Sequence, residues 1–425
     1  MEPTSERRLV RAALSTGAVF ALSGALGASW VARIPAVRDQ LHTRPGPLGL
    51  ALLCAGAGSL LTMPFVGRAA TRWGSRRVVV WSALGACVLV ALLPRARSVP
   101  ELGALLLAYG GFYGAWDVAM NVHGSAVELA ASRPWMPRYH AGWSAGAIVG
   151  AGLGALAAHA GLSAAADLAL AGSLTFALLL PALRGFVDDR ERAAPLAAAD
   201  AATGPAAPSD GDGGSDTDVE GGGPSRTRRT VLTRRLVLIG LITLCGTTVE
   251  GAAADWLALH LHDDVHTTAA VAAAGYAVFS LAMAATRYSG TWVTDRVGRV
   301  GSLRLAGLVC VAGIGLTATA SLASVAFLGT LLWGMGTALV FPAAMSAGGE
   351  TPGRPSDGIA AVSTIGYGGF LIGPPLIGLL ADATTLARAL LVLVVLAVAI
   401  VALASAARPL GQVVPGRRTA SRSAR

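Results

Sequence analysis

The sequence contains no lysine, so all 33 of its basic residues are arginines, and with 24 acidic residues they give a net charge of +9. Charge of either sign is scarce, because only 13% of the 425 residues are charged. A soluble domain usually carries about a quarter charged residues. This scarcity excludes an ordinary water-soluble enzyme.

Several motifs are also absent. Despite 54 glycines there is no Gly-X-Y period, which excludes collagen. The four cysteines are far apart and form no Cys-x-x-Cys pair, so we interpret them as packing residues rather than disulfides or zinc ligands. No Gly-x-x-x-x-Gly-Lys-Ser/Thr loop is present, so ATP is not the expected energy source and no cofactor is expected.

Hydrophobic residues make up 54% of the chain and cluster in runs long enough to cross a bilayer. Small residues such as glycine let helices approach closely in lipid. We therefore predict an all-α membrane protein of twelve transmembrane helices. The six runs of the first half are 9–30, 47–66, 78–94, 102–122, 141–160 and 162–183. The six runs of the second half are 236–257, 268–285, 303–322, 325–346, 359–380 and 386–406.

The distribution of arginine predicts the orientation of these helices. If the N-terminus is cytoplasmic, 27 arginines lie on the inner side and six on the outer side. Cytoplasmic loops of membrane proteins retain positive charge, so both termini are expected in the cytoplasm. The protein itself is expected in the inner membrane. This placement also explains the net positive charge without any nucleic-acid partner.

The two sets of runs divide the chain into domains. We predict an N-terminal six-helix bundle over 1–185, a C-terminal six-helix bundle over 234–407 and a cytoplasmic tail over 408–425. The segment 186–233 is rich in glycine and aspartate and has no apolar period. Such a composition cannot bury enough surface to order itself, so we expect a disordered cytoplasmic linker.

The two halves resemble each other, which suggests an internal duplication. Ser29-Trp30 near the end of the first run matches Asp255-Trp256 near the end of the seventh. Related glycine- and arginine-containing loops follow the second and eighth runs. The residues of the first loop are Gly67, Arg72, Gly74, Arg76 and Arg77, and those of the second are Asp295, Arg296, Gly298 and Arg299.

These loops resemble the G-x-x-x-D-R-x-G-R-R signature of the major facilitator superfamily. Thr71 stands where the family usually has aspartate, and Thr291 replaces the first glycine of the second copy. The resemblance implies two pseudo-symmetric six-helix bundles and a loop that tethers neighbouring helices on the cytoplasmic side. On physical grounds, Gly67 and Gly74 permit a tight turn. The arginines are either topological determinants that contact anionic lipid or gating residues, and Arg72 is the favoured gating residue.

Two acidic residues lie well inside the predicted runs. Asp117 lies in the fourth run and Glu250 in the seventh. Ionisable groups inside a bilayer are costly, so both are candidates for proton coupling. Asp117 and Asn121 are four residues apart on one helical face, which resembles the acid-x-x-x-Asn pattern of the fucose-permease-like branch. That resemblance implies proton coupling by the acid and sugar binding nearby; a purely structural acid is the alternative.

Other polar residues are weaker candidates. His140 and Trp143, at the start of the fifth run, could contact substrate. His140 could also relay protons, although a histidine at a helix end is more often simply solvated. Arg33 lies just outside the first run. We expect it at the membrane interface with its side chain reaching water, and the alternatives are that it pairs with an acid or steers an anionic substrate. Trp256 is expected to anchor its helix at the outer interface, with Asp255 solvated beside it. The His260, His262 and His266 group lies in an external loop, where a metal site is not expected.

We therefore predict a secondary active transporter rather than an enzyme, moving a small and possibly sugar-like solute by alternating access with protons as the coupling ion. The expected partners are that solute, protons and membrane lipid, and the chain is expected to act as a monomer. Two alternatives stay open: an antiporter that exports drugs or metabolites, and a receptor that does not transport.

Overall fold

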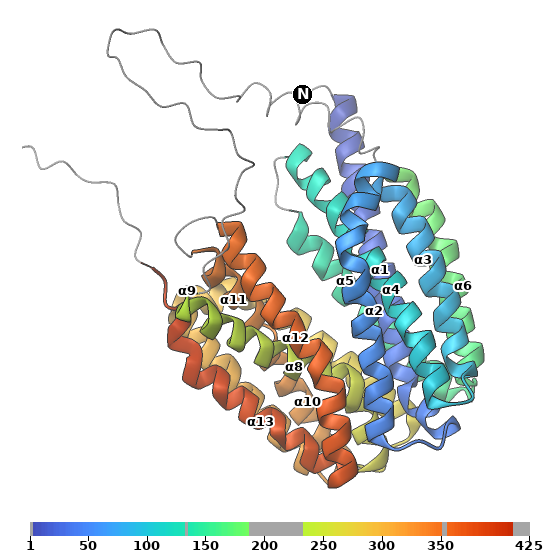
Figure 1. Cartoon of the computed structure of the whole chain (residues 1–425), viewed down its shortest axis with the longest axis vertical. Helices are drawn as coiled ribbons and strands as arrows, with labels where there is room; N and C mark the ends of the chain where they lie inside the picture. The colour runs from blue at the N-terminus through green and yellow to red at the C-terminus, as the bar shows by residue number, and fades with distance from the viewer. Residues whose placement is uncertain (1–2, 132–134, 187–232, 351–354, 411–425) are drawn as a thin grey trace, which may run out of the picture.

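The computed structural model describes residues 3–131, 135–186, 233–350 and 355–410. The chain forms two bundles of helices that stand side by side (Figure 1). Short helical turns η1, η2 and η3 follow α3, α6 and α13. The first bundle contains α1 Pro3–Gln40, α2 Pro45–Trp73, α3 Ser75–Leu92, α4 Val99–Ala131, α5 Met136–His159 and α6 Ala164–Ala182. The second contains α8 Arg234–Asp263, α9 Ala269–Thr319, α10 Ala323–Thr337, α11 Val340–Gly349, α12 Pro355–Ala383 and α13 Leu386–Leu403.

Length and composition confirm the predicted all-α membrane fold. Eleven helical stretches of the described residues are long and apolar enough to cross a membrane. The twelfth spanning helix is α4, which has 33 residues and carries Asp117 in its interior. The predicted linker over 186–233 lies outside the described residues except at its two ends, as does the tail beyond Leu410.

Polar residues fix where several helices begin. Ser163, Thr233, Thr268 and Thr385 each accept a hydrogen bond from the backbone N–H three residues later, at 3.2 or 3.3 Å. A cap of this kind satisfies one of the backbone donors that a helix start leaves free. Beyond these caps the runs are almost wholly apolar, and the helices continue through internal prolines such as Pro64 of α2 and Pro374 of α12.

Three helices differ from the predicted runs. Helix α1 continues to Gln40, which places Arg33 inside it. The eighth and ninth runs are joined in α9, which is kinked at Gly298. The tenth run is broken between Thr337 and Val340, where α10 ends and α11 begins.

The glycine turns after the second and eighth runs occupy equivalent places. Gly74 (φ 86°) separates α2 from α3, and Gly298 (φ 71°) makes the kink in α9. Positive φ at these positions favours glycine, as the sequence indicated. Gly67, by contrast, lies inside α2, so its predicted part in the turn is wrong.

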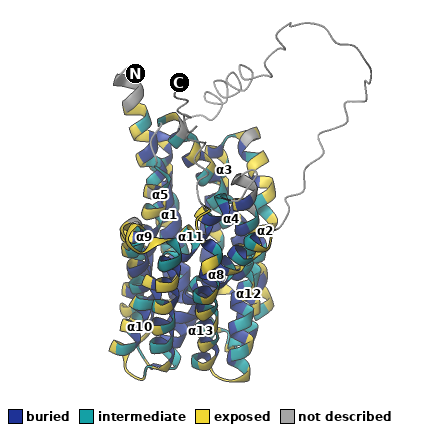
Figure 2. Cartoon of the chain, turned by 90° about the vertical axis from the view of Figure 1, so that its left-hand side faces the viewer, coloured by how far each residue is buried: buried dark blue, intermediate teal, exposed yellow. Residues whose placement is uncertain are grey.

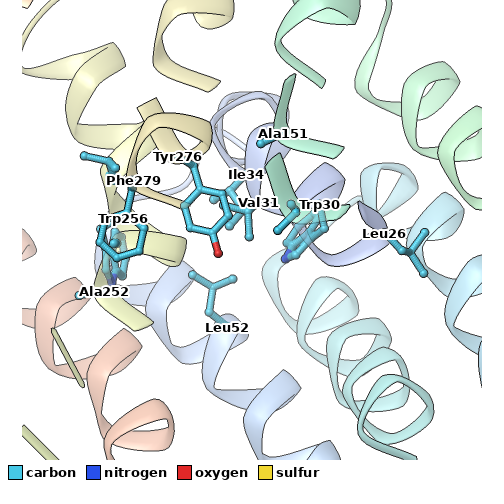
Figure 3. Close-up of a cluster of buried hydrophobic side chains, with 14 of the residues drawn as sticks. Leu26, Trp30, Val31, Ile34, Leu52, Ala151, Ala252, Trp256, Tyr276 and Phe279 are labelled. Carbon is cyan, nitrogen blue, oxygen red and sulfur yellow. The ribbon is translucent and has the colours of Figure 1, made fainter. Parts of the chain in front are cut away.

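The buried residues lie along the inside of the bundles, with exposed residues on the outer faces (Figure 2). One apolar cluster extends through both bundles. At their junction, Trp30 and Ile34 of α1 and Leu52 of α2 lie close to Trp256 of α8 and Tyr276 of α9 (Figure 3). The two bundles therefore share a continuous core at this level.

The bundles meet through α1 with α8, α2 with α12, and α5 with α9. They are together at the end opposite the N-terminus and diverge toward the end that carries it (Figure 1). At the joined end, Arg38 Nη2 lies 2.6 Å from Asp263 Oδ1, and the backbone N–H of Gly46 donates to Asp382 Oδ1 at 3.1 Å. These bonds link residues from different bundles.

The end of the N-terminal bundle is anchored by an aromatic contact. The rings of His123 and Phe186 are nearly parallel, with centroids 3.7 Å apart. His123 Nδ1 lies 3.1 Å from the hydroxyl of Ser75, at the start of α3. Phe186 is therefore held against α4 directly before the segment 187–232.

Candidate functional site

Asp117 lies halfway along α4 and is half-buried. Asn121 is one helical turn later, and its Nδ2 donates to the Asp117 carbonyl at 2.9 Å and to Oδ1 at 3.3 Å. No ion pair of Asp117 occurs within the described part of the chain. The sequence therefore identified a pair of residues that the structure brings together, and it is a carboxylate with an amide partner rather than a cation.

A tyrosine lies one turn before this pair. The Tyr113 hydroxyl donates to the Ser23 carbonyl of α1 at 3.0 Å, so α4 and α1 are tied together next to Asp117. Tyr113 is also within electrostatic range of Asp117 and close to Trp143 of α5. The predicted candidate Trp143 is therefore near Asp117, whereas Tyr113 was missed by the sequence analysis.

Tyrosines of the other bundle face this region. Tyr367 of α12 is within electrostatic range of Asp117. Tyr276 of α9 is within electrostatic range of Tyr113 and of Glu250. The hydroxyl of Tyr276 points into the junction between the bundles (Figure 3). Tyr367 of the other bundle therefore lies near Asp117, and Tyr276 lies near Tyr113. A tyrosine in an apolar run gave no signal of this in the sequence.

Glu250 is not isolated in the way that Asp117 is. Its two carboxylate oxygens lie 3.3 and 3.4 Å from Nη2 of Arg287. Arg287 lies two residues beyond the predicted run 268–285, but inside the span Ala269–Gly290. The apolar run ended two residues too early, because an arginine beside it is typical of a loop. An ionised carboxylate inside a membrane span favours a cationic partner, and this preference of Glu250 could have identified Arg287 from the sequence.

His140 lies on the other side of the junction from this pair. It is exposed in α5, and its ring meets Phe20 edge-on with centroids 5.3 Å apart. Arg287 is within electrostatic range of His140, so side chains of the two bundles approach each other here. No contact joins His140 to Asp117 or Asn121 among the interactions of the described residues.

Arg33 does not reach water at the interface; it pairs with an acid, which was the alternative that the sequence left open. Only 5% of its side chain is exposed, and its Nε lies 2.5 Å from Asp167 Oδ2 of α6. A second bond runs from Nη2 to the Leu162 carbonyl at 3.1 Å. Because α1 continues past this point, Arg33 lies inside the bundle and its charge is neutralised there.

Trp256 and Asp255 also lie deeper than predicted. The Trp256 side chain is fully buried at the junction of the bundles rather than at the membrane surface. Asp255 is half-buried rather than solvated. Both corrections follow from the length of α8, which runs to Asp263.

The histidines after Trp256 have structural partners. His260 is buried, with Nδ1 2.7 Å from Asp264 Oδ2 and Nε2 2.9 Å from the Thr317 carbonyl. His262 Nδ1 lies 2.9 Å from Asp263 Oδ1, beside the contact with Arg38. Within the described residues no group of histidine, cysteine and acidic side chains could hold a metal ion.

The predicted gating residues lie at the diverging end of the bundles. Arg72, Arg76, Asp295 and Arg296 are exposed there. The Arg296 guanidinium lies over the Trp292 ring, 4.0 Å from its centroid.

Arg299, which follows Gly298, has a different environment. Its Nη2 and Nη1 lie 2.5 and 2.8 Å from the two carboxylate oxygens of Glu350. These charge-assisted hydrogen bonds from Arg299 hold the pKa of Glu350 below its usual value of 4.5. The sequence analysis did not single out Glu350.

Residues 14–366 match the family model described as the Major Facilitator Superfamily. The chain is 32% identical to the uncharacterized transporter y4wD of Sinorhizobium fredii, over 89% of this chain and 94% of that protein. It is 30% identical to the membrane protein MosC of Rhizobium meliloti, over 91% of this chain and 87% of that protein.

Solved structures share the fold at low sequence identity. A mutant of the nucleoside transporter NupG has a TM-score of 0.73 at 11% identity, covering 93% of this chain and 99% of that chain. A bacterial homologue of the human lysosomal transporter Spinster, in an inward-facing and unoccupied conformation, has a TM-score of 0.70 at 12% identity, covering 96% of this chain and 98% of that chain.

Proposed function

Because the chain belongs to the major facilitator superfamily, we propose that it is a secondary active transporter that moves a small solute across the inner membrane by alternating access, driven by protons that bind Asp117. One observation carries this proposal. Asp117 is half-buried in a spanning helix, and Asn121 is the sole hydrogen-bond partner of its carboxylate in the described part of the chain.

The isolation of Asp117 gives a chemical reason for coupling. A charged side chain at the centre of a bilayer costs at least about 3 kcal/mol. Binding a proton removes the charge, so the bundles can close around Asp117 at lower cost once it is protonated. Glu250 is a weaker candidate for coupling because Arg287 already neutralises it.

We infer that this conformation is open toward the cytoplasm. The arginine distribution supports cytoplasmic termini, and the bundles diverge at the end that carries the N-terminus (Figure 1). At the opposite end the contacts of Arg38 with Asp263 and of Gly46 with Asp382 join them. Reporter fusions at Gly213 and Thr419 should both read cytoplasmic; an external reading at either position would reverse this orientation.

The proposed solute carries several hydroxyl groups, as sugars and nucleosides do. Asp117 and Asn121 supply hydrogen-bond acceptors and a donor, and two tyrosines of the other bundle lie nearby, Tyr367 within electrostatic range of Asp117 and Tyr276 within electrostatic range of Tyr113. The resemblance of the Asp117–Asn121 pattern to fucose permeases supports a sugar-like solute. The fold shared with the nucleoside transporter NupG makes nucleosides the second group to test.

The test is the substitution Asp117→Asn in proteoliposomes that contain a pH-sensitive dye. L-fucose, D-glucose, uridine and adenosine are the probes. Wild-type protein should move protons inward with a probe, and Asp117→Asn should abolish this proton movement while keeping probe exchange, because asparagine preserves shape and hydrogen bonding but cannot carry a proton.

The matched control is Glu101→Gln, which removes an exposed carboxylate from the first turn of the same helix. It should transport as the wild type does. Normal proton movement in Asp117→Asn together with its loss in Glu250→Gln would transfer the coupling role to α8. Proton movement opposite to that of the probe would indicate an antiporter. No flux of any probe above empty liposomes would favour a receptor.

A further inference from the structure

The break in the tenth span has a specific chemical cause. Helix α10 ends at Thr337 and α11 begins at Val340. In a continuous helix the carbonyl of Ala338 would accept a hydrogen bond from the N–H of residue 342. Residue 342 is proline, which has no N–H. Pro342 therefore deprives the Ala338 carbonyl of its helical donor.

This carbonyl is in a place where losing a donor is costly. Ala338 is fully buried. A backbone carbonyl without a partner in the membrane interior costs several kcal/mol, so another donor is required. Arg287 of α9 supplies it, because its Nε donates to the Ala338 carbonyl at 3.4 Å.

The same guanidinium binds Glu250 of α8 through Nη2. One arginine thus connects three membrane spans at the level of the break. Its contact distances of 3.3 to 3.4 Å are long for charge-assisted bonds, which are usually about 2.7–2.9 Å. Bonds of this length hold the break less tightly than the helix bond that Pro342 removes.

Glycines make room for the break on both neighbouring helices. A Cβ at Gly246 of α8 would lie 2.6 Å from Val340, and a Cβ at Gly290 of α9 would lie 2.6 Å from Leu339. Gly246 is one turn before Glu250, and Gly290 is one turn after Arg287. The two helices that supply the charges therefore also supply the space for the residues at the break.

We propose that Ala338–Leu339 is a hinge in the transport cycle and that Arg287 is its positioning residue, holding the freed carbonyl of Ala338 while Glu250 holds Arg287. Bending at this hinge moves α11 and the start of α12 relative to the N-terminal bundle. Only the role of this bending in transport rests on the proposed alternating-access function. The hinge itself needs neither protons nor an identified solute.

Hydrogen–deuterium exchange of the protein in lipid nanodiscs tests the hinge directly. The double variant Glu250→Gln/Arg287→Met removes both charges, so that neither is left unpaired. It should raise the exchange rate of the amides over 338–343 about fivefold to tenfold, the effect of one lost hydrogen bond. Adding Pro342→Ala restores the missing N–H and should return the exchange to the wild-type rate or below.

The matched control is the double variant Arg33→Met/Asp167→Asn, which removes the buried ion pair of the other bundle. It should leave exchange over 338–343 unchanged. Unchanged exchange in Glu250→Gln/Arg287→Met, or the same increase in the control, would overturn the hinge. These outcomes are independent of Asp117→Asn, so a failure of proton coupling is distinguished from a failure of the hinge.

A distance measurement tests whether the hinge takes part in the movement of the bundles. If Arg287 were only structural, closing the break would not change the distances between the bundles. Spin labels at Ala130 of α4 and Ile359 of α12 report on the diverging ends; Ile359 packs beside Gly349 at the end of α11. The single variant Pro342→Ala should narrow the distance distribution of the wild type. A distribution identical to the wild type would overturn the role of the hinge in movement, even if the double variant does not fold.

Discussion

The two bundles share a helical plan but use their charges differently. In the N-terminal bundle Arg33 and Asp167 neutralise each other, and α4 is continuous with Asp117 unpaired. In the C-terminal bundle the deep acid Glu250 is paired, and the tenth span beside it is broken. Among the described residues, one bundle therefore keeps a carboxylate without a cationic partner on a continuous helix, and the other keeps a neutralised carboxylate beside a broken one.

The internal repeat shows where this difference arose. Aligning Asp255 with Ser29 places Gly24 opposite Glu250, and aligning the two loops places Met63 opposite Arg287. Gly24 has no room for a side chain, because a Cβ there would lie 2.1 Å from the Trp143 carbonyl. The repeat thus preserved the helices and the glycine turns but not the charged residues within the spans.

The largest expected effect compares the buried Arg33 with the half-buried Arg287. Arg33→Met leaves Asp167 unpaired in a site where 9% of its side chain is exposed. Removing one partner of a buried pair costs about 3–5 kcal/mol. Arg287→Met should cost less, because the side chains of Glu250 and Arg287 are 20% and 31% exposed. Melting of each variant in detergent, followed by size-exclusion chromatography, measures both effects, and equal losses would contradict the comparison.

A second prediction concerns the contact between α2 and α12, where the bundles meet. A Cβ at Gly49 would lie 2.5 Å from the Pro374 carbonyl, so Gly49→Ala should oppose the joined conformation. Spin labels at Leu162 and Thr384, at this end of the two bundles, should show longer distances in the variant. Gly152→Ala is the control, because nothing lies within 4 Å of a Cβ there. Equal distances in both variants would show that the contact does not limit closure.

The smallest expected effect concerns acids at the ends of the fourth and tenth spans. Glu128 Oε2 accepts hydrogen bonds from the backbone N–H groups of Trp135 and Met136, at 2.6 and 2.7 Å, and so caps α5. Glu350 instead pairs with Arg299. Glu128 of the N-terminal bundle therefore stabilises the start of a helix, whereas Glu350 of the C-terminal bundle forms a salt bridge.

Because the folded pKa of Glu350 is lowered, its stabilisation is fully present above the usual pKa of 4.5 and is lost as the pH falls through the folded pKa. A third of its side chain is exposed, so the contribution is at most about 1 kcal/mol. Melting between pH 7 and pH 3 should show a steeper loss below pH 4.5 for the wild type than for Glu350→Gln. Parallel curves would exclude this contribution.

Apolar periodicity was enough to predict the spans, because a run of about 20 apolar residues is stable in lipid only as a helix. It was also enough to place Asp117 and Asn121 on one face. The apolar runs left Arg33 and Arg287 outside the spans, because an apolar run in the sequence ends at the first charged residue. A helix in the structure continues past a charged residue wherever a partner neutralises its charge. Such partners, Asp167 and Glu250, come from distant parts of the sequence, so only the packed bundles bring them together.

The contact of Phe186 with His123 fixes one end of the connection between the bundles, and the cap of α8 by Thr233 fixes the other. The 46 residues over 187–232 can span at most about 165 Å at 3.6 Å per residue. That length is about five times the thickness of the bilayer core. The chain between Phe186 and Thr233 is therefore long enough that its length alone sets no limit on how far the two bundles can separate.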